Sequence, residues 1–246
     1  MGVELIKTGV LGLDQILKGG LRRNSSILVT GSPGTGKTIF ALQFVYYGAK
    51  DNNENGIFIT TEENLDDIRQ FASNLGMDIK SMEAKKKLFF VQKPLTTLKG
   101  GLVSIKGLID AIKKNNVKRV SLDSMIFFDY LYPRFNGNKM EFRRQVLMFI
   151  NQLRRAGVTF LAVSERSVTD FDRFTYDMMD FVFEGFIVLS RIRKGSYFER
   201  VITVAKIRGQ DHSLDVYPIA IGVDGLKVLF DQTPFSLVEK EDKGFK

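Results

Sequence analysis

A glycine-rich run has the residue types and spacing of a phosphate-binding loop: Gly31, Ser32, Pro33, Gly34, Thr35, Gly36, Lys37 and Thr38. Its glycines allow the backbone to fold around a phosphate with N–H groups pointing inward, where a Cβ would obstruct. An apolar run precedes the loop and a helical pattern follows it, so the positive end of a helix dipole would add to the anion site. We therefore predict that this run binds nucleotide phosphates.

Three side chains would complete a Mg-ATP site. Lys37 is expected to reach the β- and γ-phosphates, and the hydroxyl of Thr38 is expected to be a Mg²⁺ ligand. Asp123 ends the apolar strand pattern from Arg119 to Leu122, and we expect it to hold the same ion through water. The alternative for Asp123 is a residue that caps a turn at Ser124. The predicted cofactors are ATP and Mg²⁺.

Hydrolysis also needs a group that orients or deprotonates water in line with the γ-phosphate. Glu62 and Glu63 follow the strand pattern Ile57 to Ile59 at its carboxyl end, the edge of a parallel sheet at which ligands bind. Adjacent carboxylates on a loop normally point apart, so we predict that Glu62 acts on the water and that Glu63 either tunes it or bonds neighbouring backbone. In the alternative, both residues begin the next helix, where acidic residues favour the dipole.

The elements that must position these residues alternate between strand and helix patterns, which predicts a mostly parallel sheet with helices on both faces. Short runs of branched and aromatic residues predict strands at 26–30, 56–60, 88–91, 118–122 and 159–163. Helical spacing is found at 37–50, 64–75, 102–115 and 140–156.

The pattern changes after Phe183 to paired strands at 186–193, 198–206, 216–221 and 226–230, with a turn at 194–196. These strands predict antiparallel hairpins that extend the sheet. The fold class is therefore α/β, with a mostly parallel central sheet and a C-terminal antiparallel β extension. We expect one domain over residues 1–235 and a flexible tail over 236–246.

Composition narrows the classes of function. The chain of 246 residues has no cysteine, which excludes disulfides and thiolate metal sites and favours a reducing interior. Neither a leader pattern nor an apolar run of about 18 residues is found, so we expect a cytoplasmic protein without membrane contact. The net charge of +8 favours polyanions without identifying one. We interpret Lys85, Lys86 and Lys87 as a solvated helix end, and paired phenylalanines as core.

Nearly the whole chain resembles the KaiC-like branch of the RecA and RadA ATPases. The resemblance depends on motifs in this order: Thr8-Gly9-Val10-Leu11-Gly12-Leu13-Asp14, Gly19-Gly20, the phosphate loop, Thr61-Glu62-Glu63, Leu122-Asp123-Ser124, Ser164-Glu165-Arg166, Lys206-Ile207-Arg208-Gly209, and His212. It implies a RecA-like P-loop fold in a homo-oligomer, which we expect to be a hexamer, with ATP between subunits.

The resemblance also implies that Lys206, Arg208 and His212 approach the nucleotide of the neighbouring subunit. A guanidinium supplied across an interface neutralises charge that develops on the γ-phosphate, so Arg208 would act as an arginine finger. From the residues alone, Lys206 and Arg208 are equally consistent with the outward face of a strand, and His212 with a surface loop.

Two departures from the family pattern affect the expected function. Arg22 stands where the family usually has proline, a change in a surface turn that should leave nucleotide binding intact. The positions that correspond to the autophosphorylated pair of KaiC are Phe181 and Val182, which lack a hydroxyl. We therefore predict no autophosphorylation of that type.

The leading hypothesis is an oligomeric ATPase that converts slow hydrolysis into a change of subunit packing or partner affinity. A second is a DNA-repair accessory whose loops at 130–138 and 169–176 face a channel, with Tyr132, Arg134, Arg173 and Phe174 as DNA contacts. A third is a scaffold that is switched by nucleotide and barely hydrolyses it.

Overall fold

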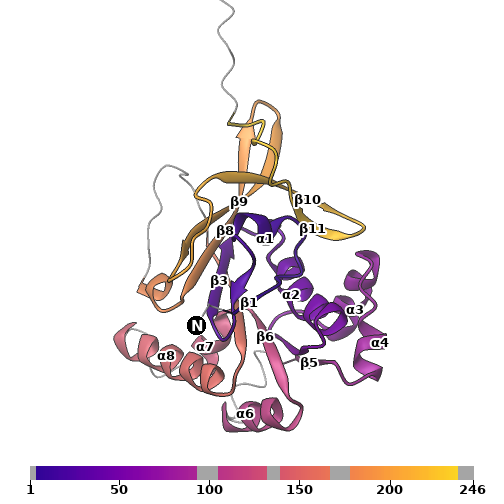
Figure 1. The fold of residues 1–246 in the computed structure, drawn as a ribbon, viewed down its shortest axis with the longest axis vertical. Helices are drawn as coiled ribbons and strands as arrows, with labels where there is room; N and C mark the ends of the chain where they lie inside the picture. The colour runs from indigo at the N-terminus through magenta and orange to yellow at the C-terminus, as the bar shows by residue number, and fades with distance from the viewer. Residues whose placement is uncertain (1–3, 93–104, 132–138, 167–177, 238–246) are drawn as a thin grey trace, which may run out of the picture.

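The computed structural model describes residues 4–92, 105–131, 139–166 and 178–237, and the structural statements below concern these residues (Figure 1). One sheet of nine strands has the order β11-β10-β9-β8-β3-β7-β6-β4-β5. The pairs from β8 across to β5 are parallel, and those from β8 to β11 are antiparallel. The strands are β3 (Ser26–Gly31), β4 (Asn55–Thr60), β5 (Leu88–Gln92), β6 (Val117–Asp123), β7 (Thr159–Glu165), β8 (Gly185–Lys194), β9 (Tyr197–Ile207), β10 (Val216–Gly222) and β11 (Gly225–Val228).

The side chains of the strands alternate between two apolar clusters, one on each face of the sheet. Helices cover both faces and complete these clusters. In β3, Ile27 and Val29 join one cluster and Leu28 joins the other. The first cluster includes residues of α1 (Leu13–Ile16), α2 (Lys37–Asp51), α3 (Leu65–Asn74) and α4 (Ile79–Ala84). The second includes residues of α6 (Ile105–Lys114), α7 (Ile126–Leu131) and α8 (Lys139–Arg155).

Smaller elements complete the described chain. The two-stranded sheet of β1 (Leu5–Ile6) and β2 (Leu21–Arg22) precedes β3, and the 3₁₀ helix η2 (Met178–Phe181) precedes β8. None of the described helices is long and apolar enough to cross a membrane.

The predicted fold class is confirmed, and the differences lie at element boundaries and in short elements that were not predicted. The last strand ends at Val228 and not at Phe230, which lies beyond the pairing of β10 with β11. The helix α4, which has six residues, was not predicted as an element, although its end at Ala84 before the three lysines agrees with their interpretation as a helix end. Residues 102–104 of the predicted helix lie outside the described residues.

A buried ion pair joins β6 to the connection between α2 and β4, and a further bond from the same arginine reaches α2. The side chain of Arg119, on β6, is 0% exposed, and its Nε donates to the carboxylate of Glu54 at 2.6 Å. Its Nη1 donates to the carbonyl of Phe44, and the guanidinium lies 4.8 Å from the Phe44 ring centre. A Cβ on Gly48 would come within 2.4 Å of Arg119, so α2 approaches β6 closely only because this position is glycine.

Candidate functional site

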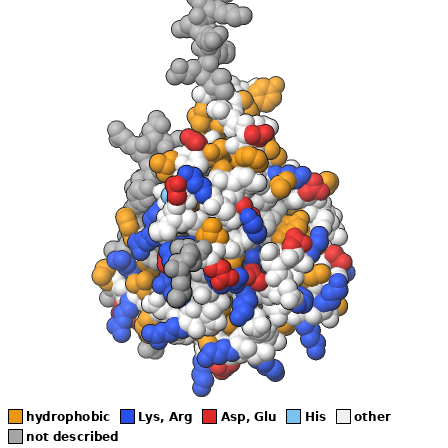
Figure 2. Space-filling model, in the orientation of Figure 1, with side chains coloured by type: hydrophobic (Ala, Val, Ile, Leu, Met, Phe, Trp, Pro, Cys, Tyr) orange, Lys and Arg blue, Asp and Glu red, His pale blue; other side chains and the backbone are white. Residues whose placement is uncertain are grey.

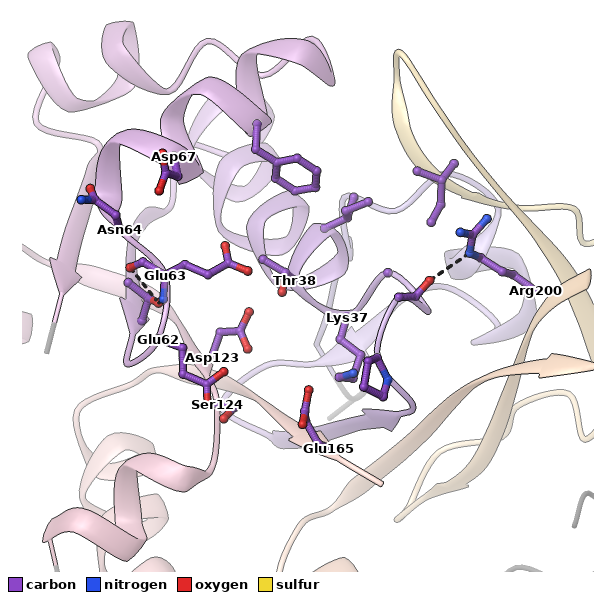
Figure 3. A pocket seen from close by; sticks show the side chains of 17 residues that line it. Lys37, Thr38, Glu62, Glu63, Asn64, Asp67, Asp123, Ser124, Glu165 and Arg200 are labelled. Carbon is purple, nitrogen blue, oxygen red and sulfur yellow. Dashed lines mark hydrogen bonds between the residues drawn. The ribbon is translucent and has the colours of Figure 1, made fainter. Parts of the chain in front are cut away.

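A cavity of about 890 Å³ lies at the carboxyl ends of β3, β4, β6 and β7, where α2 begins (Figure 3). Ligands of open α/β proteins bind at this edge of the sheet. Figure 3 shows the carboxylates of Glu63, Asp123 and Glu165 directed into the space around Lys37 and Thr38. The lining residues include Pro33, Gly34, Gly36, Lys37, Thr38, Thr60, Glu62, Glu63, Asn64, Asp67, Phe71, Asp123, Ser124, Glu165, Arg200 and Ile221.

The phosphate loop has the conformation that its glycines permit. Gly34 and Gly36 have φ values of 77° and 103°, in the region that side chains disfavour, and Gly36 is the N-cap of α2. Inside the loop, the Thr35 hydroxyl donates to the carbonyl of Ser32 at 2.9 Å. The free N–H groups at the start of α2 therefore face the cavity with the positive end of the helix dipole.

Lys37 lies at the floor of this loop, 7% exposed, and its Nζ donates to the carbonyl of Ser32 at 3.0 Å. Burial lowers the pKa of Lys37, and the carboxylates of Glu165, Asp123 and Glu62 oppose that change. The ammonium group of Lys37 is therefore surrounded by acidic side chains that partly offset the effect of its burial.

Thr38 and Asp123 both line the cavity, and the Thr38 hydroxyl lies near enough to the Asp123 carboxylate to affect its pKa. Burial raises the pKa of Asp123, while the Thr38 hydroxyl and the charge of Lys37 lower it. The N–H of Ser124 donates to the Thr61 hydroxyl at 3.3 Å and that of Met125 to the carbonyl of Val163 at 2.7 Å, so neither of these N–H groups is bonded to the Asp123 side chain.

A hydroxyl beside one carboxylate fits Mg²⁺ that arrives with nucleotide, because this ion keeps phosphate and water ligands and takes few from protein. Burial also raises the pKa of Asp123 by more than its favourable contacts lower it, so a bound cation would stabilise the charged carboxylate. The described residues contain no cluster of three or more histidine and acidic side chains that would form a separate metal site.

Glu62 and Glu63 lie on the loop between β4 and α3. The N-cap of α3 is Asn64, whose side chain accepts from the N–H of Asp66, so the alternative that both glutamates begin the helix is wrong. The N–H of Glu63 donates to the Thr60 hydroxyl at 3.2 Å. Desolvation raises the pKa of Glu63, and the charges of Asp123, Glu62 and Asp67 raise it further. Both carboxylates line the cavity.

The raised pKa of Asp123 leads to a stability prediction. A carboxyl group whose pKa is raised by folding stabilises the folded state below its ordinary pKa, and this contribution is lost as pH rises through the raised value. Without nucleotide at pH 7, we therefore expect Asp123→Asn to raise the midpoint of thermal unfolding by about 2–4 °C, or ~1 kcal/mol. The gain should shrink as the pH falls below the raised pKa.

Differential scanning fluorimetry between pH 4 and pH 8 measures this difference. Asp67→Asn is the matched control, because Asp67 lies on the same cavity and is exposed. With Mg-ATP the order should reverse, since the parent protein gains ligand stabilisation that the variant lacks. A midpoint that Asp123→Asn leaves unchanged or lowers at pH 7 would contradict the prediction.

Sequence reasoning missed several residues of the cavity. Arg200, on β9, donates from Nε to the carbonyl of Gly34 at 3.1 Å, and Ile221, on β10, packs beside Gly36. Both come from the C-terminal hairpins, which fold back over the phosphate loop. Their positions depend on the register of β8 with β9, which pairs Arg200 with Arg191, and no local pattern encodes that register. Glu165 belongs to a motif in the resemblance, and a role could have been assigned to it there.

Lys206, Arg208 and His212 are not among the described residues that line the cavity. The ammonium of Lys206 donates to the carbonyls of Asp180 and Phe183, at 2.6 and 2.9 Å. Arg208 is exposed and donates from Nη2 to the carbonyl of Phe181 at 2.9 Å. Neither ring nitrogen of His212 has a hydrogen-bond partner within the described part of the chain.

Arg208 lies at the opposite end of the sheet from the phosphate loop. Its N–H donates to the carbonyl of Glu184, whose own N–H donates to the carbonyl of Ser26, where β3 begins. The loop starts at the other end of β3, and a strand of six residues spans about 16 Å. Arg208 therefore cannot reach phosphates bound in its own chain without a rearrangement of β9.

Arg22, which stands where the family usually has proline, is bonded to the backbone at Arg208. Its Nη1 donates to the carbonyl of Arg208 at 3.0 Å, across the turn that Gly209 forms. The residue that replaces the usual proline thus supports the backbone of the finger candidate, a contact that the sequence did not indicate.

The proposed DNA contacts Tyr132, Arg134, Arg173 and Phe174 lie outside the described residues. Figure 2 shows lysine and arginine side chains spread over the face viewed, with acidic side chains among them. The described surface on this face therefore offers no single basic stripe in support of a nucleic-acid channel.

Comparisons with known proteins agree on one family. The family model described as "ATPase: KaiC" matches residues 6–233. Two circadian clock oscillator proteins KaiC from strains of Prochlorococcus marinus are 33% and 34% identical to this chain. The matches cover 93% of this chain and 46% and 45%, respectively, of the two relatives. The chain thus spans about half the length of the curated relatives it matches. A crystal structure of a KaiC-like protein from Pyrococcus horikoshii OT3 has a TM-score of 0.77 at 30% identity, over 92% of this chain and 99% of that one.

Proposed function

Because this chain belongs to the KaiC family of ATPases, we propose that it binds Mg-ATP in the cavity at the phosphate loop and hydrolyses it slowly. The observation that carries this proposal is that Lys37, Thr38 and Asp123 line one cavity at the N-terminus of α2. A cation, the N-terminus of a helix and two oxygen-bearing side chains of the kind that Mg²⁺ prefers thus border one space, which supports the proposal.

Each residue then has a separate task. The backbone N–H groups from Gly31 to Thr38 hold the phosphates, and Lys37 neutralises the charge between the β- and γ-phosphates. Thr38 and Asp123 would hold Mg²⁺, which supplies charge stabilisation to the phosphates when bound. Glu62 orients the attacking water and takes its proton, and Glu63 adjusts the local charge.

We further propose that the active unit is a homo-oligomer, most simply a hexamer, in which Lys206, Arg208 and His212 approach the neighbour's nucleotide. The support is their placement, because Arg208 is exposed at the end of the sheet opposite its own phosphate loop. In this arrangement hydrolysis changes the contact between subunits, and with it the packing of the oligomer or its affinity for a partner. Residues 1–235 would form the ATPase domain.

The proposal is tested by static light scattering on a sizing column with Mg-ATP, Mg-ADP or no nucleotide, together with phosphate release. We expect an oligomer that Mg-ATP stabilises and a slow release of phosphate. Lys37→Ala should abolish both effects, because truncation of one partner in a buried charge pair costs about 2–5 kcal/mol of affinity. Phosphate release that Lys37→Ala leaves unchanged would refute the proposed site.

A further inference from the structure

A short segment physically connects the phosphate loop with Lys206 and Arg208. It comprises η2 and the residues up to β8, and its anchor is Asp180, which is 1% exposed. The Asp180 carboxylate accepts two hydrogen bonds from Arg166, from Nη1 at 2.7 Å and from Nη2 at 2.9 Å. A two-pronged pair of this kind fixes the orientation of both side chains as well as their separation.

On one side, Arg166 is tied to the phosphate loop. It directly follows β7, and its N–H donates to the carbonyl of Gly31 at 3.2 Å. The Ser32 hydroxyl lies 3.5 Å from the carbonyl oxygen of Arg166, and the guanidinium lies 5.7 Å from the ring centre of Phe186. The backbone of Arg166 therefore follows the position of the loop.

On the other side, the segment holds both cations of the Lys206-Ile207-Arg208 motif through its carbonyl groups. The carbonyl of Asp180 accepts from Lys206, and that of Phe181 accepts from Arg208. Lys206 also lies 5.9 Å from the centre of the Phe181 ring. A shift of the Asp180 backbone would therefore move Lys206 and Arg208 together.

Val182 and Phe183 pack this segment into the core, but the packing around the ion pair itself is incomplete. The ion pair borders a second cavity of about 180 Å³, which Ser164, Glu165, Arg166 and Asp180 line with three apolar side chains. Glu165 lines this cavity as well as the larger one. Since space is left beside the pair, the hydrogen bonds between Arg166 and Asp180 restrain the end of η2 where packing is incomplete.

We propose that Arg166 and Asp180 are positioning residues that orient Lys206 and Arg208 toward the nucleotide of the neighbouring subunit. The inference rests on the proposed function, in which these cations act in trans. It adds that a subunit without the ion pair remains able to hydrolyse its own ATP, but serves its neighbour poorly. An ion pair with a purely structural role would impair both tasks equally.

Mixed oligomers separate the two tasks. A donor chain with Glu62→Gln and Glu63→Gln supplies Arg208 but does not hydrolyse, and a receiver chain with Arg208→Ala has its own glutamates but no finger. When equal amounts assemble at random, about one interface in four joins an intact site to an intact finger. Phosphate release should then return in the mixture, although each chain alone is inactive.

Asp180→Asn is then placed in either chain. In the donor, we expect it to reduce the recovered phosphate release about 10²-fold, the effect of misplacing a catalytic group by about 1 Å. In the receiver, it should leave the recovery unchanged. Arg166→Gln in the donor should act like Asp180→Asn. Glu184→Gln in the donor is the control, because it removes an ion pair with Arg154 in the same segment, keeps an oxygen that can accept from the N–H of Ser26, and does not touch the Asp180 anchor.

The outcomes are distinct. Loss from the donor position alone supports the positioning role. Equal loss from both positions, or none from the donor, overturns it, and the unfolding midpoint of each variant shows whether a loss reflects misfolding. If the unsubstituted donor and receiver do not recover activity together, the action of Arg208 in trans is wrong, and this inference falls with it.

Discussion

Replacing Arg208 with alanine should reduce phosphate release by about 10³-fold or more, while Mg-ATP binding persists. The guanidinium would contribute only in the transition state, when charge develops on the γ-phosphate of the neighbour's nucleotide. Binding in the ground state depends on the phosphate loop, at the far end of the sheet from Arg208. The turnover number should therefore fall without a matching change in nucleotide affinity.

Phosphate release and binding of a fluorescent ATP analogue measure the two effects separately. Arg193→Ala is the matched control, since Arg193 donates to Gly195 within the turn that joins β8 and β9 and lies outside the cavity lining. A chain that hydrolyses ATP equally well with or without Arg208 would refute the composite site. It would then be a self-contained ATPase.

Glu62→Gln should reduce hydrolysis about 10²- to 10⁴-fold, because the amide keeps the shape of the carboxylate but cannot take a proton from water. Since the phosphate loop, Thr38 and Asp123 are untouched, the variant should retain Mg-ATP and accumulate in the ATP-bound assembly. Single-turnover phosphate release and light scattering measure the two parts of this result.

Glu63→Gln is the comparison for Glu62→Gln, because both carboxylates line the cavity from the same loop. The raised pKa of Glu63 reflects desolvation and the charges of Asp123, Glu62 and Asp67, which suits a residue that tunes the site. We therefore expect a smaller loss from Glu63→Gln. If it abolishes hydrolysis while Glu62→Gln does not, the two assignments must be exchanged.

The sequence was sufficient to predict the parts of this molecule that local chemistry determines. The glycines and the lysine of the phosphate loop occur together because the backbone must fold around a phosphate that the lysine then reaches. Short runs of β-branched and aromatic residues indicate buried strands. The parallel core and the antiparallel extension follow from the same patterns. Asp123 could be picked out because it ends a strand, and the two glutamates because they follow one, at the end of the sheet where the phosphate loop lies.

The contacts between distant segments could not be predicted in this way. The approach of Arg200 to Gly34 depends on the register of two long strands, and the burial of Arg119 beside Gly48 depends on how α2 crosses the sheet. The Asp180 anchor is a single polar residue before a strand, with no spacing that marks it. Such contacts arise from tertiary packing, which periodicity does not encode.

The antiparallel turn between β8 and β9 returns the chain along the sheet. The end of the subunit that bears the phosphate loop therefore differs from the end that bears Arg208. If a two-fold axis related two subunits, identical ends would meet, and neither nucleotide site would receive an Arg208 from the other subunit. Composite sites therefore require a head-to-tail contact between subunits. Such contacts form a closed ring when the rotation from one subunit to the next divides a full turn, and otherwise they form a filament. The number of sites would equal the number of subunits in a ring, whereas a filament would always have one incomplete site at its end.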